Sequence, residues 1–260
     1  MNHLSHTQAN MFMRCQKQYY YRYLEGLVIP TGAMLLLGKS YHKAHEVNFG
    51  QKIESKKDLP ATEVKEAFAT DFEERKNEEE IDWKDEKPGD LKDTGVNLTG
   101  AYHDKVSPLV NPTHVELPFE IEFDNADYQF IGRVDVVTSE RIIDLKTAKR
   151  KPPEADIHKD LQATAYMLAN RYAINDGIER SFRYDYAIKT KTPSLHSIET
   201  VRTDEDINWY LMWIGKLAQA IKQATDSGVF IENTNGWHCS PDWCGFFEKC
   251  QPYKQRVISI

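Results

Sequence analysis

The sequence has few cysteines, no long apolar run and no excess of positive charge. Four of its 260 residues are cysteines, and the longest apolar run, residues 33–37, is far too short to span a bilayer. The first residues also lack the basic and then apolar layout of a secretory signal. These absences argue against a membrane protein and predict a cytoplasmic one, in a compartment where thiols stay reduced.

The overall charge gives no support for nucleic-acid binding. The net charge is −7 and the sequence pI is about 5.7. Positive charge is concentrated locally, because residues 146–151 (KTAKRK) contain four cations. Taken alone, such a run is an ordinary solvated loop. Any nucleic acid would therefore be held by a local basic channel and not by a broad positive face.

The four cysteines are unevenly spaced. Cys239, Cys244 and Cys250 lie within twelve residues near one end of the chain, and Cys15 lies near the other. In a reducing compartment this clustering favours a metal site over disulfides. Four buried, unligated thiols are the alternative, but Trp237, Trp243, Phe246 and Phe247 beside the trio argue against it. Four thiolates suit either structural zinc or an iron–sulfur cluster.

Apolar periodicity predicts an α+β protein with a central mixed sheet flanked by helices. Helices are predicted over residues 4–27, 32–49, 63–80, 91–106, 156–172 and 208–225, and strands over 115–123, 128–137, 141–147, 180–189 and 195–201. Ser5 or Thr7 could cap the first helix. The length allows a single domain with an N-terminal helical part (1–111), a core (112–203) and a C-terminal helix with the cysteine-rich tail (204–260).

Two aspartates are predicted to face each other across a hairpin. A turn at residues 138–141 pairs residues whose numbers sum to 279, which sets Asp135 opposite Asp144. Opposed side chains lie about 5 Å apart, where like charges are destabilising unless a hard cation such as Mg²⁺ lies between them. Lys146 projects from the same face as Asp144. This grouping suits metal-assisted hydrolysis of a phosphodiester, but a slip of one residue in register would destroy it.

The hairpin sequence resembles the core of the RecB-like PD-(D/E)XK nucleases. Residues 132–135 (GRVD) and 143–147 (IDLKT) look like the G-x-x-D and D-x-K motifs of that family, although Val134 replaces the proline of the family name. Two further motifs appear in the family order. They are Gly38-x3-His42-x3-Glu46 and Gln162-x3-Tyr166.

The resemblance implies a restriction-endonuclease-like core and roles for particular residues. His42, Asp135, Asp144 and the carbonyl of Leu145 would bind Mg²⁺ or Mn²⁺, and Lys146 would act on the attacking water and the phosphate. Gln162 and Tyr166 would lie near the substrate phosphate. For His42, core packing is the plain alternative, and for Gln162 and Tyr166 it is ordinary polar packing. Glu116 could join the metal ligands, but a solvated strand glutamate is an equal alternative.

The cysteines resemble those of the iron–sulfur subgroup of this family, which includes the AddB nuclease and the CRISPR-associated RecB-like exonucleases. The resemblance implies a structural [4Fe–4S] cluster held by Cys15, Cys239, Cys244 and Cys250, as a clasp between the chain ends. Structural Zn²⁺ is the alternative. Four residues separate Cys239 from Cys244, where relatives usually have two.

Together these features predict a metal-dependent DNA exonuclease that prefers single-stranded ends. Lys149, Arg150 and Lys151 would contact the nucleic-acid backbone, and aromatic residues at 19–23 could stack bases, although core packing is the simpler role for them. Protein partners in a repair, recombination or CRISPR complex are compatible with this function. Two other hypotheses are a catalytically degenerate DNA-binding module and an iron–sulfur redox protein.

Overall fold

The computed structural model describes residues 3–122 and 128–250, and its contacts divide the chain into two compact units. The terminal unit comprises residues 1–30, 122–131 and 211–260, and the sheet unit comprises residues 31–121 and 132–210. All four cysteines belong to the terminal unit, whereas the expected active-site residues belong to the sheet unit. That these parts form one nuclease domain stays a prediction.

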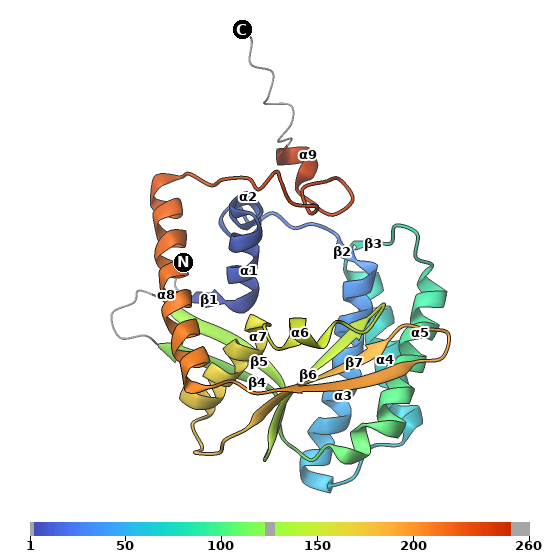
Figure 1. The fold of residues 1–260 in the computed structure, drawn as a ribbon. Coiled ribbons are helices and arrows are strands. Elements are labelled where there is room, and N and C mark those ends of the chain that lie inside the picture. Colours follow the sequence, from blue (N-terminus) through green and yellow to red (C-terminus); the bar gives the residue numbers. More distant parts are fainter. Residues whose placement is uncertain (1–2, 123–127, 251–260) are drawn as a thin grey trace. The chain divides into compact units, whose positions relative to one another are not determined.

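The sheet unit is built on a mixed sheet, as predicted (Figure 1). Its strands are β4 (Pro112–Glu122), β5 (Gln129–Thr138), β6 (Arg141–Ala148), β7 (Ser181–Ile188) and β8 (Ser194–Thr200). β4 pairs with β5, β5 runs antiparallel to β6, β6 parallel to β7, and β7 antiparallel to β8. Val136 pairs with Ile143 and Val137 with Ile142, which confirms the predicted hairpin register.

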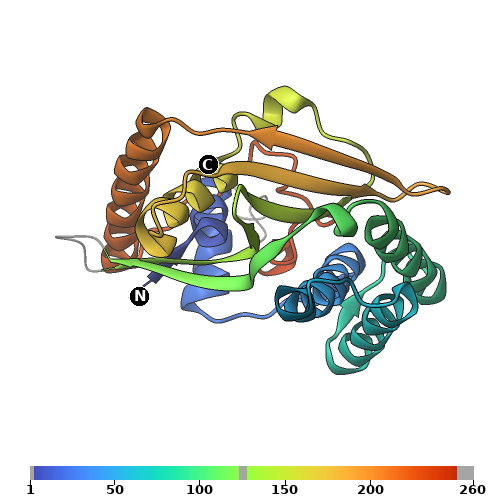
Figure 2. The ribbon, with the colours of Figure 1, turned by 90° about the horizontal axis from the view of Figure 1, so that it is seen from below.

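Three long helices share one apolar core with this sheet. They are α3 (Ala33–Ser55), α4 (Ala61–Glu78) and α5 (Pro88–Lys105), grouped in blue, teal and green beside the strands in Figure 2. α3 and α5 lie against the strands, and α4 packs on these two helices. Phe68 and Tyr102 pack into one cluster with Ile143 and Leu145 of β6. A Cβ atom at Gly95 would lie 1.9 Å from the Phe68 ring, so only glycine allows α4 and α5 to approach this closely.

Shorter elements complete the sheet unit. The two-residue strands β2 (Thr31–Gly32) and β3 (Ile81–Asp82) pair in parallel, and a 3₁₀ turn covers Ser107–Leu109. α6 (Glu154–Ile157), α7 (Leu161–Ala169) and a π-helical turn (Asn170–Ile174) connect β6 to β7. The single helix predicted over 156–172 is therefore wrong in detail, because the chain breaks before α7 and Asp160 caps that helix anew.

The terminal unit departs more from the predicted pattern. Its first helix is divided into β1 (His3–Ser5), α1 (His6–Arg14), α2 (Gln16–Tyr19) and a π-helical turn (Tyr20–Leu24). Cys15 causes the break, since its backbone is extended (φ −164°). Ser5 caps α1 in a capping box with Gln8, as one of the two predicted caps. β1 pairs in parallel with the start of β5.

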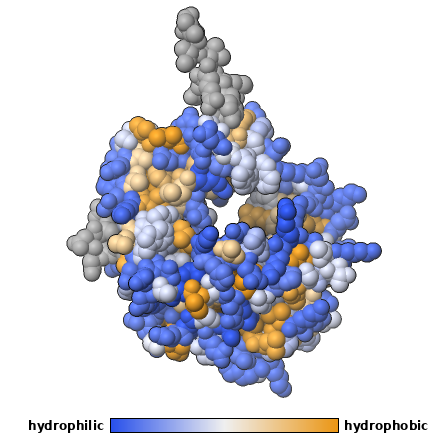
Figure 3. All heavy atoms as spheres, in the orientation of Figure 1, coloured by the Kyte–Doolittle hydropathy of each residue, from blue (hydrophilic) through white to orange (hydrophobic). Residues whose placement is uncertain are grey.

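The rest of the terminal unit is helical or irregular. α8 (Asp204–Ser227) enters it at residue 211, and α9 (Phe247–Cys250) follows the cysteine-rich loop. Tyr21 and Phe246 pack against each other and bury Cys244. Hydrophilic residues surround smaller apolar areas on the face shown in Figure 3. Within the described residues, no helix combines the length and apolar character that a membrane crossing requires.

Candidate active site

Two buried carboxylates lie at the centre of the sheet unit. Asp135 on β5 is 8% exposed, and Asp144 on β6 is 1% exposed. The observed register, continued by one residue, sets them opposite each other. Asp135 Oδ2 accepts the Leu145 backbone N–H at 2.8 Å. Burial and then the charge of Asp144 raise the pKa of Asp135 well above its usual range, which is the repulsion expected of this pair.

His42 lies against both strands from helix α3. Its Nδ1 is 3.3 Å from Asp135 Oδ2, and its Nε2 is 2.7 Å from the carbonyl oxygen of Leu145. The structure thus brings together three of the four predicted ligands. Burial lowers the pKa of His42 despite the opposing charge of Asp144, so the imidazole is held neutral, which is the form that binds metals.

Glu116 on β4 completes a compact group of ligand atoms. One ligand atom each from His42, Glu116 and Asp135 lie within 4.8 Å of one another. Glu116 has a left-handed backbone (φ 47°), which costs about 1–2 kcal/mol for a residue with a Cβ. Burial and then Asp135 raise its pKa. Carboxylate oxygens and an imidazole nitrogen fit Mg²⁺ or Mn²⁺, so the residues present match the expected metal.

Lys146 forms an ion pair with Asp144. Its Nζ is 2.7 Å from Asp144 Oδ2. Burial alone would lower the pKa of Lys146, but the charges of Asp144 and Asp135 outweigh it and raise this pKa. The lysine therefore stays charged, and its side chain is 32% exposed and open to a ligand.

Helix α7 holds Asp144 in place through a glutamine. Gln162 Nε2 donates to Asp144 Oδ1 at 3.0 Å and contacts the Tyr166 hydroxyl at 3.1 Å. Asp160, the N-cap of α7, accepts the Gln162 backbone N–H at 2.8 Å, which fixes the start of this helix. Burial and then Asp144 raise the pKa of Tyr166, so its hydroxyl is neutral.

The predicted DNA-contacting cations lie at the surface, outside this centre. Lys149, Arg150 and Lys151 follow β6 and are exposed, with Lys149 Nζ 3.9 Å from a Glu86 oxygen and Lys151 Nζ 2.9 Å from Glu154. Sequence reasoning missed Asp160, whose charge acts on Lys146, although an aspartate before an apolar helix is a recognised capping signal.

The N-terminal aromatic residues are mostly packed inside the terminal unit. Tyr19 is 0% exposed and Tyr21 is 7% exposed. These two rings therefore serve the core, and base stacking by them is excluded.

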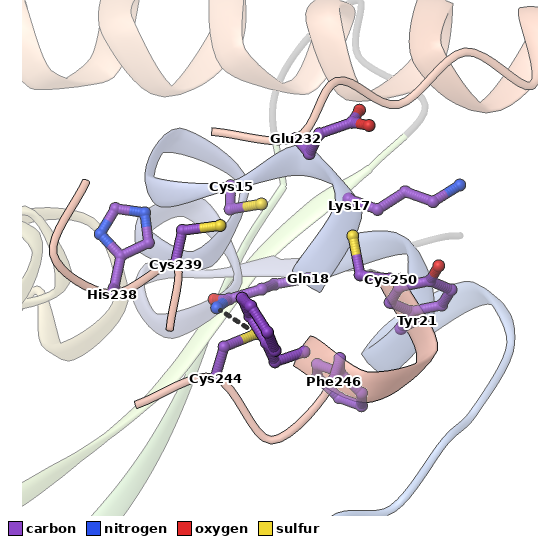
Figure 4. Close-up of a pocket in the computed structure, with 11 residues that line it drawn as sticks. Cys15, Lys17, Gln18, Tyr21, Glu232, His238, Cys239, Cys244, Phe246 and Cys250 are labelled. Atoms are coloured by element: carbon purple, nitrogen blue, oxygen red, sulfur yellow. Dashed lines mark hydrogen bonds between the residues drawn. The ribbon is translucent and has the colours of Figure 1, made fainter. Parts of the chain in front are cut away.

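The four cysteine side chains line one pocket in the terminal unit (Figure 4). Gln18 Nε2 is 3.1 Å from Cys244 Sγ, and burial, Glu232 and the other three thiols raise the pKa of Cys250 to about 11. No disulfide joins any of these four described residues. Cys15 thus lies beside the C-terminal trio, and the break that follows α1 presents its thiol there.

Comparisons with known proteins bear on the family and the fold of this chain. A profile of the PD-(D/E)XK nuclease superfamily matches residues 3–251. A crystal structure described as a candidate exonuclease from Eubacterium rectale has a TM-score of 0.59 at 15% identity, covering 92% of this chain and 87% of that one. A second, SSO0001, has 14% identity over 90% and 92% of the two chains, but its TM-score of 0.36 supports no argument. Curated proteins give no match. The profile match over nearly the whole sequence shows that the chain belongs to the PD-(D/E)XK nuclease superfamily.

Proposed function

We propose that the protein is a Mg²⁺- or Mn²⁺-dependent deoxyribonuclease, and that it degrades DNA from single-stranded ends. The observation that carries this proposal is the convergence of His42, Glu116 and Asp135 within 4.8 Å, next to the Asp144–Lys146 ion pair. A purely DNA-binding descendant of this fold would have no need to keep two opposed carboxylates and a charged lysine at one point.

Some of these residues would bind the metal, and others would act on the water and the phosphate or position the ligands. His42, Asp135, Asp144 and the Leu145 carbonyl would hold the metal, with Glu116 as a further ligand. When bound, the metal would lower the pKa of a water molecule and neutralise charge on the phosphate. Lys146 would orient the attacking water or stabilise charge on a phosphate oxygen. Gln162 would keep Asp144 in position through its 3.0 Å hydrogen bond, with Tyr166 supporting Gln162.

A run of exposed cations and the likeness to exonucleases support the substrate side of the proposal. Lys149, Arg150 and Lys151 are exposed directly after the strand that carries Lys146, where they could contact the DNA backbone. The Eubacterium rectale structure is described as a candidate exonuclease, and the sequence resembles RecB-like exonucleases. Because Tyr19 and Tyr21 are buried, the preference for single strands no longer has their stacking as an argument.

The cysteines would bind a [4Fe–4S] cluster that stabilises the terminal unit. All four thiols line one pocket of the terminal unit. The resemblance of Cys15 and the C-terminal trio to the iron–sulfur subgroup supports this cluster over structural zinc.

The test is digestion of end-labelled single- and double-stranded DNA with Mg²⁺, with Mn²⁺ and with EDTA. We expect cleavage only with metal, faster on single strands, and slow or absent on covalently closed single-stranded circles. Rapid cleavage of closed circles would leave an endonuclease with the same active site. Undiminished cleavage in EDTA would contradict the metal-dependent reaction itself.

A further inference from the structure

The carboxyl ends of β6 and β7 place two lysines side by side. The parallel register pairs Ala148 with Ile188, and the backbone N–H of Lys189 donates to the Ala148 carbonyl at 2.9 Å. Lys149 therefore leaves one strand next to the point where Lys189 leaves the other. Both lysines lie in the sheet unit, at the end of the strand that carries Lys146.

The contacts of these lysines leave their positive charge poorly compensated. Lys189 is half-buried, and its Nζ is 2.7 Å from the Met34 sulfur, a weak acceptor for an ammonium group with three donors. Lys149 is 75% exposed at its side chain, and Glu86 is 3.9 Å away. Burial and then the charge of Lys149 lower the pKa of Lys189, with Glu86 opposing them, so the two ammonium groups repel each other.

We propose that Lys149 and Lys189 together bind one phosphate group of the nucleic-acid backbone, at the carboxyl ends of β6 and β7. An anion between the two ammonium groups would remove their repulsion, just as a cation between Asp135 and Asp144 would remove theirs. Lys149 is the first residue beyond β6, the strand that carries Lys146, so a phosphate bound there would lie at the carboxyl end of that strand. This inference rests on the proposed function and adds Lys189, on the strand next to the basic run, to the substrate contacts.

The test measures binding of a labelled single-stranded oligonucleotide in EDTA, so that no cleavage is needed. The variants are Lys149→Met, Lys189→Met and the double variant, because methionine keeps an apolar stem beside Met34. Lys57→Met is the matched control, since Lys57 is exposed beyond the opposite end of α3 from His42. Lys189→Arg keeps the charge and should bind like the wild type.

We expect each single variant to bind roughly 3- to 10-fold more weakly at low salt, and Lys57→Met to be unchanged. The double variant should lose little more than either single variant, because both lysines act on one phosphate. Its slope of log K against log salt should fall by about 0.7, the value for one lost contact on a single strand. Multiplicative losses with a slope change of about 1.4 would mean two separate phosphates and would overturn the shared site, as would wild-type binding by Lys189→Met.

The outcome can be separated from that of the proposed function. If the lysine variants show the expected binding changes but the wild type cleaves no DNA with Mn²⁺, the nuclease activity is refuted and the phosphate site stands. Normal cleavage with unchanged binding by all lysine variants would refute only the phosphate site.

Discussion

The carboxylate of Asp135 is tied to the main chain of the neighbouring strand, because its Oδ2 accepts the Leu145 N–H at 2.8 Å. This bond lies just beyond the backbone pair of Val136 and Ile143. It fixes Asp135 relative to the Leu145 carbonyl, which His42 contacts at 2.7 Å. The hairpin register and the geometry of the proposed metal ligands are therefore set by the same few atoms.

Asp135→Asn should stabilise the metal-free protein at pH 8. Burial and Asp144 raise the pKa of Asp135, so the folded protein binds this proton more tightly than the unfolded chain does. The resulting stabilisation is present at low pH and is lost as the pH rises through the raised pKa, at about 1.4 kcal/mol for each tenfold difference in proton affinity between the folded and unfolded chain. Asparagine mimics the protonated acid and can still accept the Leu145 N–H.

Thermal unfolding in EDTA across pH 5 to 8 measures this effect. The Tm of Asp135→Asn should exceed that of the wild type at pH 8, and the difference should shrink toward pH 5. Leu145 keeps its acceptor in this variant, so a lower Tm at pH 8 would mean that the charged carboxylate is needed for the fold and that the repulsion is misjudged.

Gln162→Leu should weaken metal binding and cleavage by roughly 10- to 100-fold, because Asp144 Oδ1 loses the donor that orients it. Tyr166→Phe is the matched comparison and should have a clearly smaller effect, since its hydroxyl contacts Gln162 and the bond to Asp144 remains. Calorimetric titration with Mn²⁺ measures the affinity. Wild-type affinity in Gln162→Leu would show that α7 does not position the carboxylate.

Anaerobically purified protein should be brown and contain about four iron and four sulfide per chain. Cys15→Ala should lose the cluster as fully as Cys244→Ala, because both thiols line the same pocket. Asp144→Asn, which lies in the sheet unit, should keep the full iron content and serves as the control. A colourless wild-type protein with stoichiometric zinc would support the structural-zinc alternative.

The central hairpin could be predicted from sequence because its determinants are local. The turn at residues 138–141 fixes the register, and alternation of apolar and polar residues fixes the faces, so Asp135, Asp144 and Lys146 were expected near one another. The mixed α+β fold was predicted from the same local alternation and periodicity, and the mixed sheet confirms it. The positions of His42 and Gln162 rested on the family resemblance, since local periodicity does not say which helix covers which strand.

The features that were missed depend on tertiary contacts. The break at Cys15 interrupts a favourable helical pattern, so the division of the predicted first helix could not be read from local periodicity. The left-handed backbone of Glu116 has no sequence signal, because glutamate rarely adopts it without surroundings that impose it. The pairing of Lys149 with Lys189 required the parallel register of β6 and β7.

The most direct test of the account is cleavage of end-labelled single-stranded DNA with Mn²⁺ by the wild type, Asp144→Asn and Lys146→Met. Asparagine and methionine nearly preserve side-chain size, so circular dichroism should show the fold intact. The account predicts metal-dependent cleavage by the wild type and none by either variant, with Mn²⁺ binding weakened in Asp144→Asn and largely retained in Lys146→Met. Cleavage at the wild-type rate by either folded variant would contradict it.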